Sequence, residues 1–257
     1  MCDQCRPAQP EQGSDGPTRR SVLRALVAAP LYRVVSAARP PVTTATTPVA
    51  TALATYGTSL HPRRDWAAGL APKGPMAVEP VVHALLVHHT VTPNAYPPDR
   101  VPAILRSMYA YHTGPEKGWP DVAYSFFVDR FGGIWEGRDG SATHPVEGSA
   151  TGGNQGSTRL CTLVGDFTTE APSLAMVDSL TKLLAALADM HKLDSTPNAV
   201  ATFVSRGSNR WKKGSTVRIP TIAGHRNTSM TTCPGDGVYP LISTGGLARK
   251  VTALRAG

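Results

Sequence analysis

The sequence predicts an α/β protein in which a mixed central β-sheet is flanked by helices. Short runs that are almost continuously apolar, such as residues 81–87, are typical of strands buried on both faces. They alternate with longer segments whose apolar residues recur every three or four positions, which is the spacing of an amphipathic helix. The 41% share of hydrophobic residues and the 17% share of charged residues are ordinary for a globular protein.

The first predicted strand, residues 81–87, is followed by a predicted helix that begins near Pro98 and runs to His112. The residues on its apolar face are Val101, Ile104, Leu105, Met108, Tyr109 and His112. This spacing places one face of the helix against the sheet. Met108 and Tyr109 are therefore expected in the core.

Two more strands, residues 122–129 and 134–136, flank Gly132 and Gly133, and a glycine pair between two strands indicates a hairpin turn. Residues 160–164 form another apolar run. Its cysteine, Cys161, has the surroundings of a buried structural thiol.

A long helix is predicted from Ser173, a candidate N-cap, to His191. The last predicted strand covers residues 217–223 and leads directly to His225. No internal repeat interrupts this alternation of strands and helices.

The N-terminal part of the chain has a different composition. Residues 1–38 contain the pair Arg19 and Arg20, then an apolar stretch and then small residues, which is the order of an export signal of the twin-arginine type. A basic, disordered N-terminus is the alternative. The apolar stretch is too short to span a bilayer. Residues 39–60, rich in Thr, Ala and Pro, are predicted to be a linker, and residues 61–257 a single domain.

Charge argues against nucleic acid as the partner. Residues 39–257 carry 21 Lys and Arg against 15 Asp and Glu, a net charge of about +6. These residues are scattered, and the one small cluster, residues 210–213, is predicted to be a solvated loop rather than part of a nucleic-acid motif.

Three histidines and one cysteine offer the ligands of a three-ligand zinc site. His88 and His89 follow the apolar strand, and His225 and Cys233 belong to one later segment. Cys233 lies in a polar turn, unlike Cys161, and two histidines with a thiolate would leave one tetrahedral position open, as in catalytic zinc sites. Because successive strand residues point to opposite faces, the choice between His88 and His89 depends on the register. The Cys2 and Cys5 pair has no second pair nearby and predicts no site.

Several short motifs occur in the order found in one enzyme family. They are residues 62–68, 87–90, 118–126, 132–138, 164–167 and 224–235, together with His112, His144 and Asn154. Over residues 61–245 the chain resembles the zinc amidases that include N-acetylmuramoyl-L-alanine amidases and peptidoglycan recognition proteins. The resemblance implies one catalytic domain with an open zinc cleft at the strand ends.

The resemblance also implies roles for particular residues. It makes His88, His225 and Cys233 the ligands of Zn2+, and Tyr124 the catalytic group that donates a hydrogen bond to the oxyanion. Thr231 is a second catalytic candidate, at a position where some members have Lys and others Thr. The substrate-binding candidates are His89, His144 and Asn154. Ala123 replaces the glycine usual before the tyrosine.

The expected function is that of an exported zinc hydrolase that cleaves the amide bond between N-acetylmuramic acid and L-alanine in peptidoglycan. The protein is expected to be a secreted or wall-associated monomer, with anionic wall polymers as further partners and no stable membrane span. One alternative is a non-catalytic peptidoglycan-binding module, which retention of Cys233, both histidines and Tyr124 disfavours. Another is a lytic toxin or phage-type lysin with the same chemistry.

Overall fold

The computed structural model describes residues 47–257. Its helices are α1 (Pro48–Thr55), α2 (Arg64–Ala67), α3 (Val101–Thr113), α4 (Leu174–Met190), α5 (Tyr239–Ser243) and α6 (Gly246–Ala256), with 3-10 turns η2 (Pro98–Arg100) and η3 (His225–Asn227). Its strands are β1 (Leu60–His61), β2 (Ala84–His89), β3 (Phe126–Val128), β4 (Ile134–Glu136), β5 (Thr158–Leu163), β6 (Val200–Val204), β7 (Thr216–Pro220) and β8 (Ile222–Gly224). The predicted export signal, residues 1–38, lies outside the described residues.

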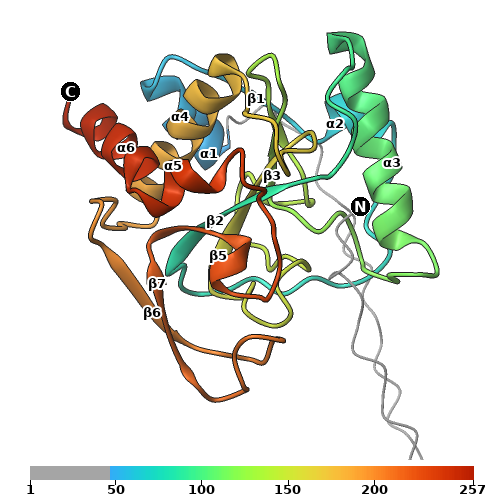
Figure 1. Cartoon of the computed structure of the whole chain (residues 1–257). Coiled ribbons are helices and arrows are strands. Elements are labelled where there is room, and N and C mark those ends of the chain that lie inside the picture. Colours follow the sequence, from blue (N-terminus) through green and yellow to red (C-terminus); the bar gives the residue numbers. More distant parts are fainter. Residues whose placement is uncertain (1–46) are drawn as a thin grey trace, which may run out of the picture. The chain divides into compact units, whose positions relative to one another are not determined.

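Six strands form one mixed sheet in the order β1-β4-β3-β5-β2-β8. Strands β2, β3, β5 and β8 are parallel, while β4 is antiparallel to β3 and β1 is parallel to β4. The carboxyl ends of four strands therefore meet at one edge, which is where clefts form in α/β sheets. Figure 1 shows helices on both sides of this sheet, so the predicted fold class is confirmed.

The two faces of the sheet bury separate apolar clusters because side chains alternate along each strand. In β2, Leu85 and Val87 pack with α1, α4 and α6, while Ala84 and Leu86 pack with α3. We call these the α4 face and the α3 face. All six residues of β2 are buried, as the apolar run predicts.

Most predicted elements are confirmed, with shifted ends. The strand predicted over residues 81–87 begins at Ala84, and Val81 is exposed. The helix predicted from Pro98 starts with a 3-10 turn and becomes α-helical at Val101, and Met108 and Tyr109 are buried as expected. Ser173 caps α4 by accepting a hydrogen bond from the backbone N–H of Met176.

The predicted linker, residues 39–60, needs correction from residue 48 onward. Residues 48–55 form α1, capped by the Thr47 side chain, and Val49 and Leu53 are buried against α4. Two apolar residues four positions apart suffice here because α4 supplies the rest of the apolar surface. Residues 39–46 lie outside the described part of the chain.

The strand predicted over residues 217–223 is also wrong as a single element. It divides at Thr221: β7 pairs with β6 in a separate antiparallel hairpin, and β8 joins the main sheet beside β2. In Figure 1 the hairpin is the orange pair of strands set apart from the main sheet. The chain thus needs only one residue to pass from one sheet to the other.

The segment that contains the first motif, residues 62–68, holds the chain on both sides of Tyr124 through buried hydrogen bonds. The Arg63 guanidinium donates to an Asp121 carboxylate oxygen over 2.9 Å and to the Gly137 carbonyl over 2.6 Å. Trp66, fully buried, donates its indole N–H to the carbonyl of Glu136. These contacts connect α2 to both sides of the segment that contains Tyr124.

Candidate metal centre

Three side chains converge at the carboxyl end of the parallel strands. His88 lies near the end of β2, and His225 directly follows β8, which pairs with β2 so that Val87 lies beside Gly224. Cys233 is held beside His225 because its carbonyl accepts a hydrogen bond from the N–H of Arg226. One potential ligand atom from each of His88, His225 and Cys233 lies within 4.8 Å of the others, and we call these three residues the cluster.

The sheet register decides between the two adjacent histidines. His88 is an even-numbered residue of β2 and lies on the α3 face, where its ring centroid is 5.3 Å from that of Tyr124 and 4.6 Å from that of His225. His89 lies on the opposite face and accepts a hydrogen bond from the N–H of Phe167 at Nδ1. His88 is therefore the histidine of β2 that joins the cluster.

Burial keeps both cluster histidines neutral. It lowers the pKa of His88 well below the ordinary value, with smaller contributions from His225 and His89. Burial likewise lowers the pKa of His225 to about 3, assisted by His89. A neutral imidazole has the free lone pair that metal binding requires.

The donor set fits a zinc ion. Nδ1 of His88 lies 3.8 Å from Sγ of Cys233. Two ligand atoms of a tetrahedral zinc site, with ordinary Zn–N and Zn–S bonds, are separated by about 3.6 Å. Two imidazoles and one thiolate are common zinc ligands, and three protein ligands leave a fourth position for water or substrate.

The hydrogen bonding of His88 distinguishes it from a structural histidine. Its Nδ1 is turned toward Sγ of Cys233, 3.8 Å away. By contrast, Nδ1 of His89 and Nδ1 of His112 each accept a backbone N–H. Nδ1 of His88 therefore faces a thiol where the other two face a backbone N–H, which favours a ligand role for His88.

The two predicted catalytic residues lie differently with respect to the cluster. Tyr124 is buried on the α3 face with its ring packed near His88. Thr231 precedes Cys233 by two residues, and its Oγ1 accepts the N–H of Cys233 over 3.2 Å. Tyr124 thus borders the cluster directly, whereas the observed contact of Thr231 shapes the loop that holds Cys233.

The three predicted substrate-binding residues are not grouped together. His89 and Asn154 are buried, and Asn154 donates to the carbonyl of Thr228 in the loop between His225 and Cys233. His144 is exposed, and its carbonyl accepts a hydrogen bond from Arg159. In this structure, therefore, His89 and Asn154 hold the loops around the cluster, and only His144 presents an exposed side chain.

His112 is a site residue that sequence reasoning treated as structural. Its Nδ1 accepts the N–H of Ala123, and its ring lies edge-on to Tyr124 with centroids 5.6 Å apart. Burial lowers its pKa to about 3, so the ring is neutral and its proton is on Nε2. A histidine at a buried position of α3 was the available signal, but only the tertiary structure places it beside Tyr124.

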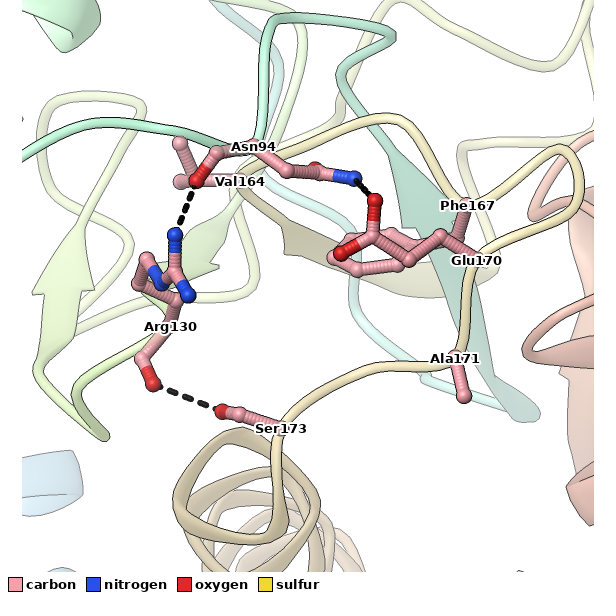
Figure 2. A pocket seen from close by; sticks show the side chains of 7 residues that line it. All are labelled: Asn94, Arg130, Val164, Phe167, Glu170, Ala171 and Ser173. Carbon is pink, nitrogen blue, oxygen red and sulfur yellow. Dashed lines mark hydrogen bonds between the residues drawn. The ribbon is translucent and has the colours of Figure 1, made fainter.

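A separate small cavity lies next to the loop that follows β5. It has a volume of about 150 Å³ and contains none of the predicted site residues (Figure 2). Its polar groups pair with one another: Asn94 donates to Glu170, Arg130 to the carbonyl of Asn94, and Ser173 to the carbonyl of Arg130. Phe167 lines the cavity and also donates its N–H to His89, so this network supports the loop beside the cluster.

Comparison with known proteins agrees with this arrangement. A family model described as N-acetylmuramoyl-L-alanine amidase matches residues 78–236. The human N-acetylmuramoyl-L-alanine amidase is 29% identical over 188 residues, which is 72% of this chain and 28% of that protein. Peptidoglycan-recognition protein 1 of Holotrichia diomphalia is 27% identical over 177 residues, which is 69% of this chain and 75% of that protein.

A solved structure of similar fold is that of a mutant Drosophila peptidoglycan recognition protein LB in complex with tracheal cytotoxin. Its TM-score is 0.56 at 23% identity, and the match covers 72% of this chain and 93% of that one. The family model covers more than half of this chain, although the chain spans little more than a quarter of the human relative. The chain belongs to the N-acetylmuramoyl-L-alanine amidase family.

Proposed function

We propose that this protein is a zinc hydrolase that cleaves the amide bond between N-acetylmuramic acid and L-alanine in peptidoglycan. The observation that carries the proposal is the buried His88, His225 and Cys233 group, in which one potential ligand atom of each residue lies within 4.8 Å of the others. A bound zinc ion would supply Lewis acidity and activate water at neutral pH. The two histidines and the thiolate would hold it.

Tyr124 has the position of an oxyanion donor in this proposal. Its ring packs beside His88, and a phenol can donate a hydrogen bond to the oxygen on which negative charge develops. His112 and Phe127 contact the Tyr124 ring edge-on and limit its movement. Thr231 carries no charge, so it can assist only as a neutral hydrogen-bond donor.

The substrate class rests on the family and on its relatives. The curated relatives are named as amidases or peptidoglycan recognition proteins, and one similar structure holds tracheal cytotoxin. A non-catalytic binding module is the runner-up. The presence of Cys233 together with both histidines and Tyr124 favours the hydrolase, because binding alone requires no group with an open ligand position.

A metal analysis combined with a wall-degradation assay tests the proposal. The purified full chain should hold about one zinc per molecule and release fragments from purified peptidoglycan, and a chelator should stop the release. Cys233→Ala and His225→Ala should each lose zinc and activity. His83→Ala, outside the group, is the matched control and should keep both. A zinc-free Cys233→Ala protein with full activity would overturn the assignment.

We further propose that the protein is exported to the cell wall by the twin-arginine route. The support is the order of residues in the N-terminal segment, with Arg19 and Arg20 before an apolar stretch. In the described residues 47–257, no helix is long and apolar enough to cross a membrane. Replacing both arginines by lysine should retain the precursor inside the cell, and normal secretion of that variant would contradict this route.

A further inference from the structure

The stretch from Ser195 to Gly235 has an unusual charge composition. It contains six Lys and Arg residues and no Asp or Glu. It includes β6, β7 and β8, followed by the loop that holds His225 and Cys233. The positive charge of the domain is therefore concentrated beside the candidate metal centre.

Two of the six cations have acidic partners from elsewhere in the chain. Arg206 pairs with Glu79 over 2.6 Å, and Arg226 pairs with Asp236 over 2.9 Å. The other four make no ion pair within residues 47–257 and are exposed; they are Arg210, Lys212, Lys213 and Arg218. Their charge is available to an anionic partner.

The hairpin tip, residues 205–215, is hydrogen-bonded to the loop between His225 and Cys233, which we call the metal-site loop. Ser208 donates its hydroxyl to the carbonyl of Thr228 over 2.9 Å, and Trp211 donates its indole N–H to the carbonyl of Asn227 over 3.1 Å. Asn209 also accepts the N–H of Met230. Whatever binds the tip is therefore held close to the loop between His225 and Cys233.

A surface hollow adjoins the tip. It has a volume of about 550 Å³, and Lys213 and Arg206 line it together with His83 and Phe203. Among residues 47–257, no Asp or Glu lines it. An anionic group in this hollow would contact Lys213. Arg210 and Lys212 belong to the same hairpin tip.

The residue types of the tip limit the classes of molecule that it can bind. Single-stranded nucleic-acid sites use exposed aromatic rings on which bases stack. Trp211 is the one aromatic residue of residues 205–215, is only partly exposed, and has the Arg210 guanidinium 5.9 Å from its ring centroid. A membrane-binding tip would need exposed Leu, Phe or Trp side chains to insert. A flexible polyanion without aromatic groups fits the cationic, polar tip better.

We propose that the hairpin tip binds a phosphodiester polymer of the cell wall, of the poly(glycerol phosphate) type, and holds it beside the metal centre. The choice of wall polymer rests on the proposed function. Arg210, Lys212 and Lys213 make the contacts. Each contacted phosphate releases a counterion, so affinity falls as salt rises.

Direct binding of the purified full chain to poly(glycerol phosphate) tests this surface. With three phosphate contacts and the salt slope of a single-stranded polyanion, affinity should fall about 20-fold between about 50 mM and about 200 mM salt. The triple variant Arg210→Gln, Lys212→Gln and Lys213→Gln should bind about tenfold more weakly at low salt and show a shallower salt slope.

A matched triple variant separates a local site from net charge. Arg100→Gln, Lys192→Gln and Lys250→Gln removes the same charge from exposed positions outside the hairpin and should change the affinity less than about twofold. Equal losses in both triples would overturn the proposal. Tighter binding to DNA of the same charge, lost in the tip triple, would instead make the tip a nucleic-acid site.

Separate measurements show whether a variant has lost folding or catalysis rather than polymer binding. Both triples should keep the wild-type unfolding temperature, and if the tip triple does not, the single variants Lys212→Gln and Lys213→Gln provide the same comparison. The assay measures binding without hydrolysis. It can therefore fail while the amidase assay succeeds, or succeed while the amidase assay fails.

Discussion

The buried pair between Arg63 and Asp121 provides a stability prediction that can be worked out from the structure. Asp121 is fully buried, and its carboxylate accepts hydrogen bonds from Arg63, from the N–H of Val122 and from the N–H of Asp139. Replacing Asp121 by Ala leaves the buried guanidinium with only a longer contact, 3.9 Å, to the partly exposed Asp139 carboxylate. It also leaves two backbone N–H groups without their acceptor.

The expected cost is large for a single substitution. Removing one partner of a buried ion pair typically destabilises a protein by about 3 to 5 kcal/mol. For a domain of this size, that corresponds to a fall of about 10 °C in the unfolding temperature. Arg63 keeps its contact with the Gly137 carbonyl, which favours the lower end of the range.

Denaturant unfolding monitored by circular dichroism measures this cost. The double variant Arg63→Met with Asp121→Ala should lose less than the sum of the two single variants, because it leaves no uncompensated buried charge. Asp65→Ala is the control: Asp65 is exposed and pairs with His61 and Arg64 at the surface, so the change should stay within about 0.5 kcal/mol. An Asp121→Ala cost equal to that of the control, or strictly additive losses in the double variant, would refute the reasoning.

Three further predictions concern catalysis, the N-terminal helix and pH. Tyr124→Phe should lower kcat by about 10²-fold to 10³-fold without changing zinc content or peptidoglycan binding, and wild-type turnover in steady-state kinetics would contradict the donor role. Leu53→Ala should lower the free energy of unfolding by about 2 to 5 kcal/mol, because Leu53 is fully buried against the core; no loss in a denaturant titration would show that α1 adds little. Burial lowers the pKa of His112 to about 3, so between pH 6.5 and pH 3 the unfolded chain binds a proton that the folded chain excludes, and stability falls as the pH falls. His112→Asn should remove up to about 1.4 kcal/mol per pH unit from that slope, and unchanged slopes in unfolding titrations would contradict it.

The sequence by itself determined the features that depend on local pattern. The apolar run before His88 and the helical spacing from Val101 to His112 are local signals, and both elements form as predicted apart from their ends. The residue types of a site with one histidine after the apolar strand, His225 and Cys233 were also visible in the sequence, and the family resemblance named His88 as that histidine; the structure brings the three together.

Only the tertiary structure decided the features that depend on packing partners distant in sequence. Two apolar residues in a segment rich in Thr and Ala did not reveal α1, since the surface that buries Val49 and Leu53 belongs to α4. The choice of His88 over His89 required the register of β2 against its neighbours, because adjacent strand residues face opposite sides of a sheet. The burial of Asn154 under the metal-site loop likewise comes from hydrogen bonds between segments more than 70 residues apart, which no local pattern encodes.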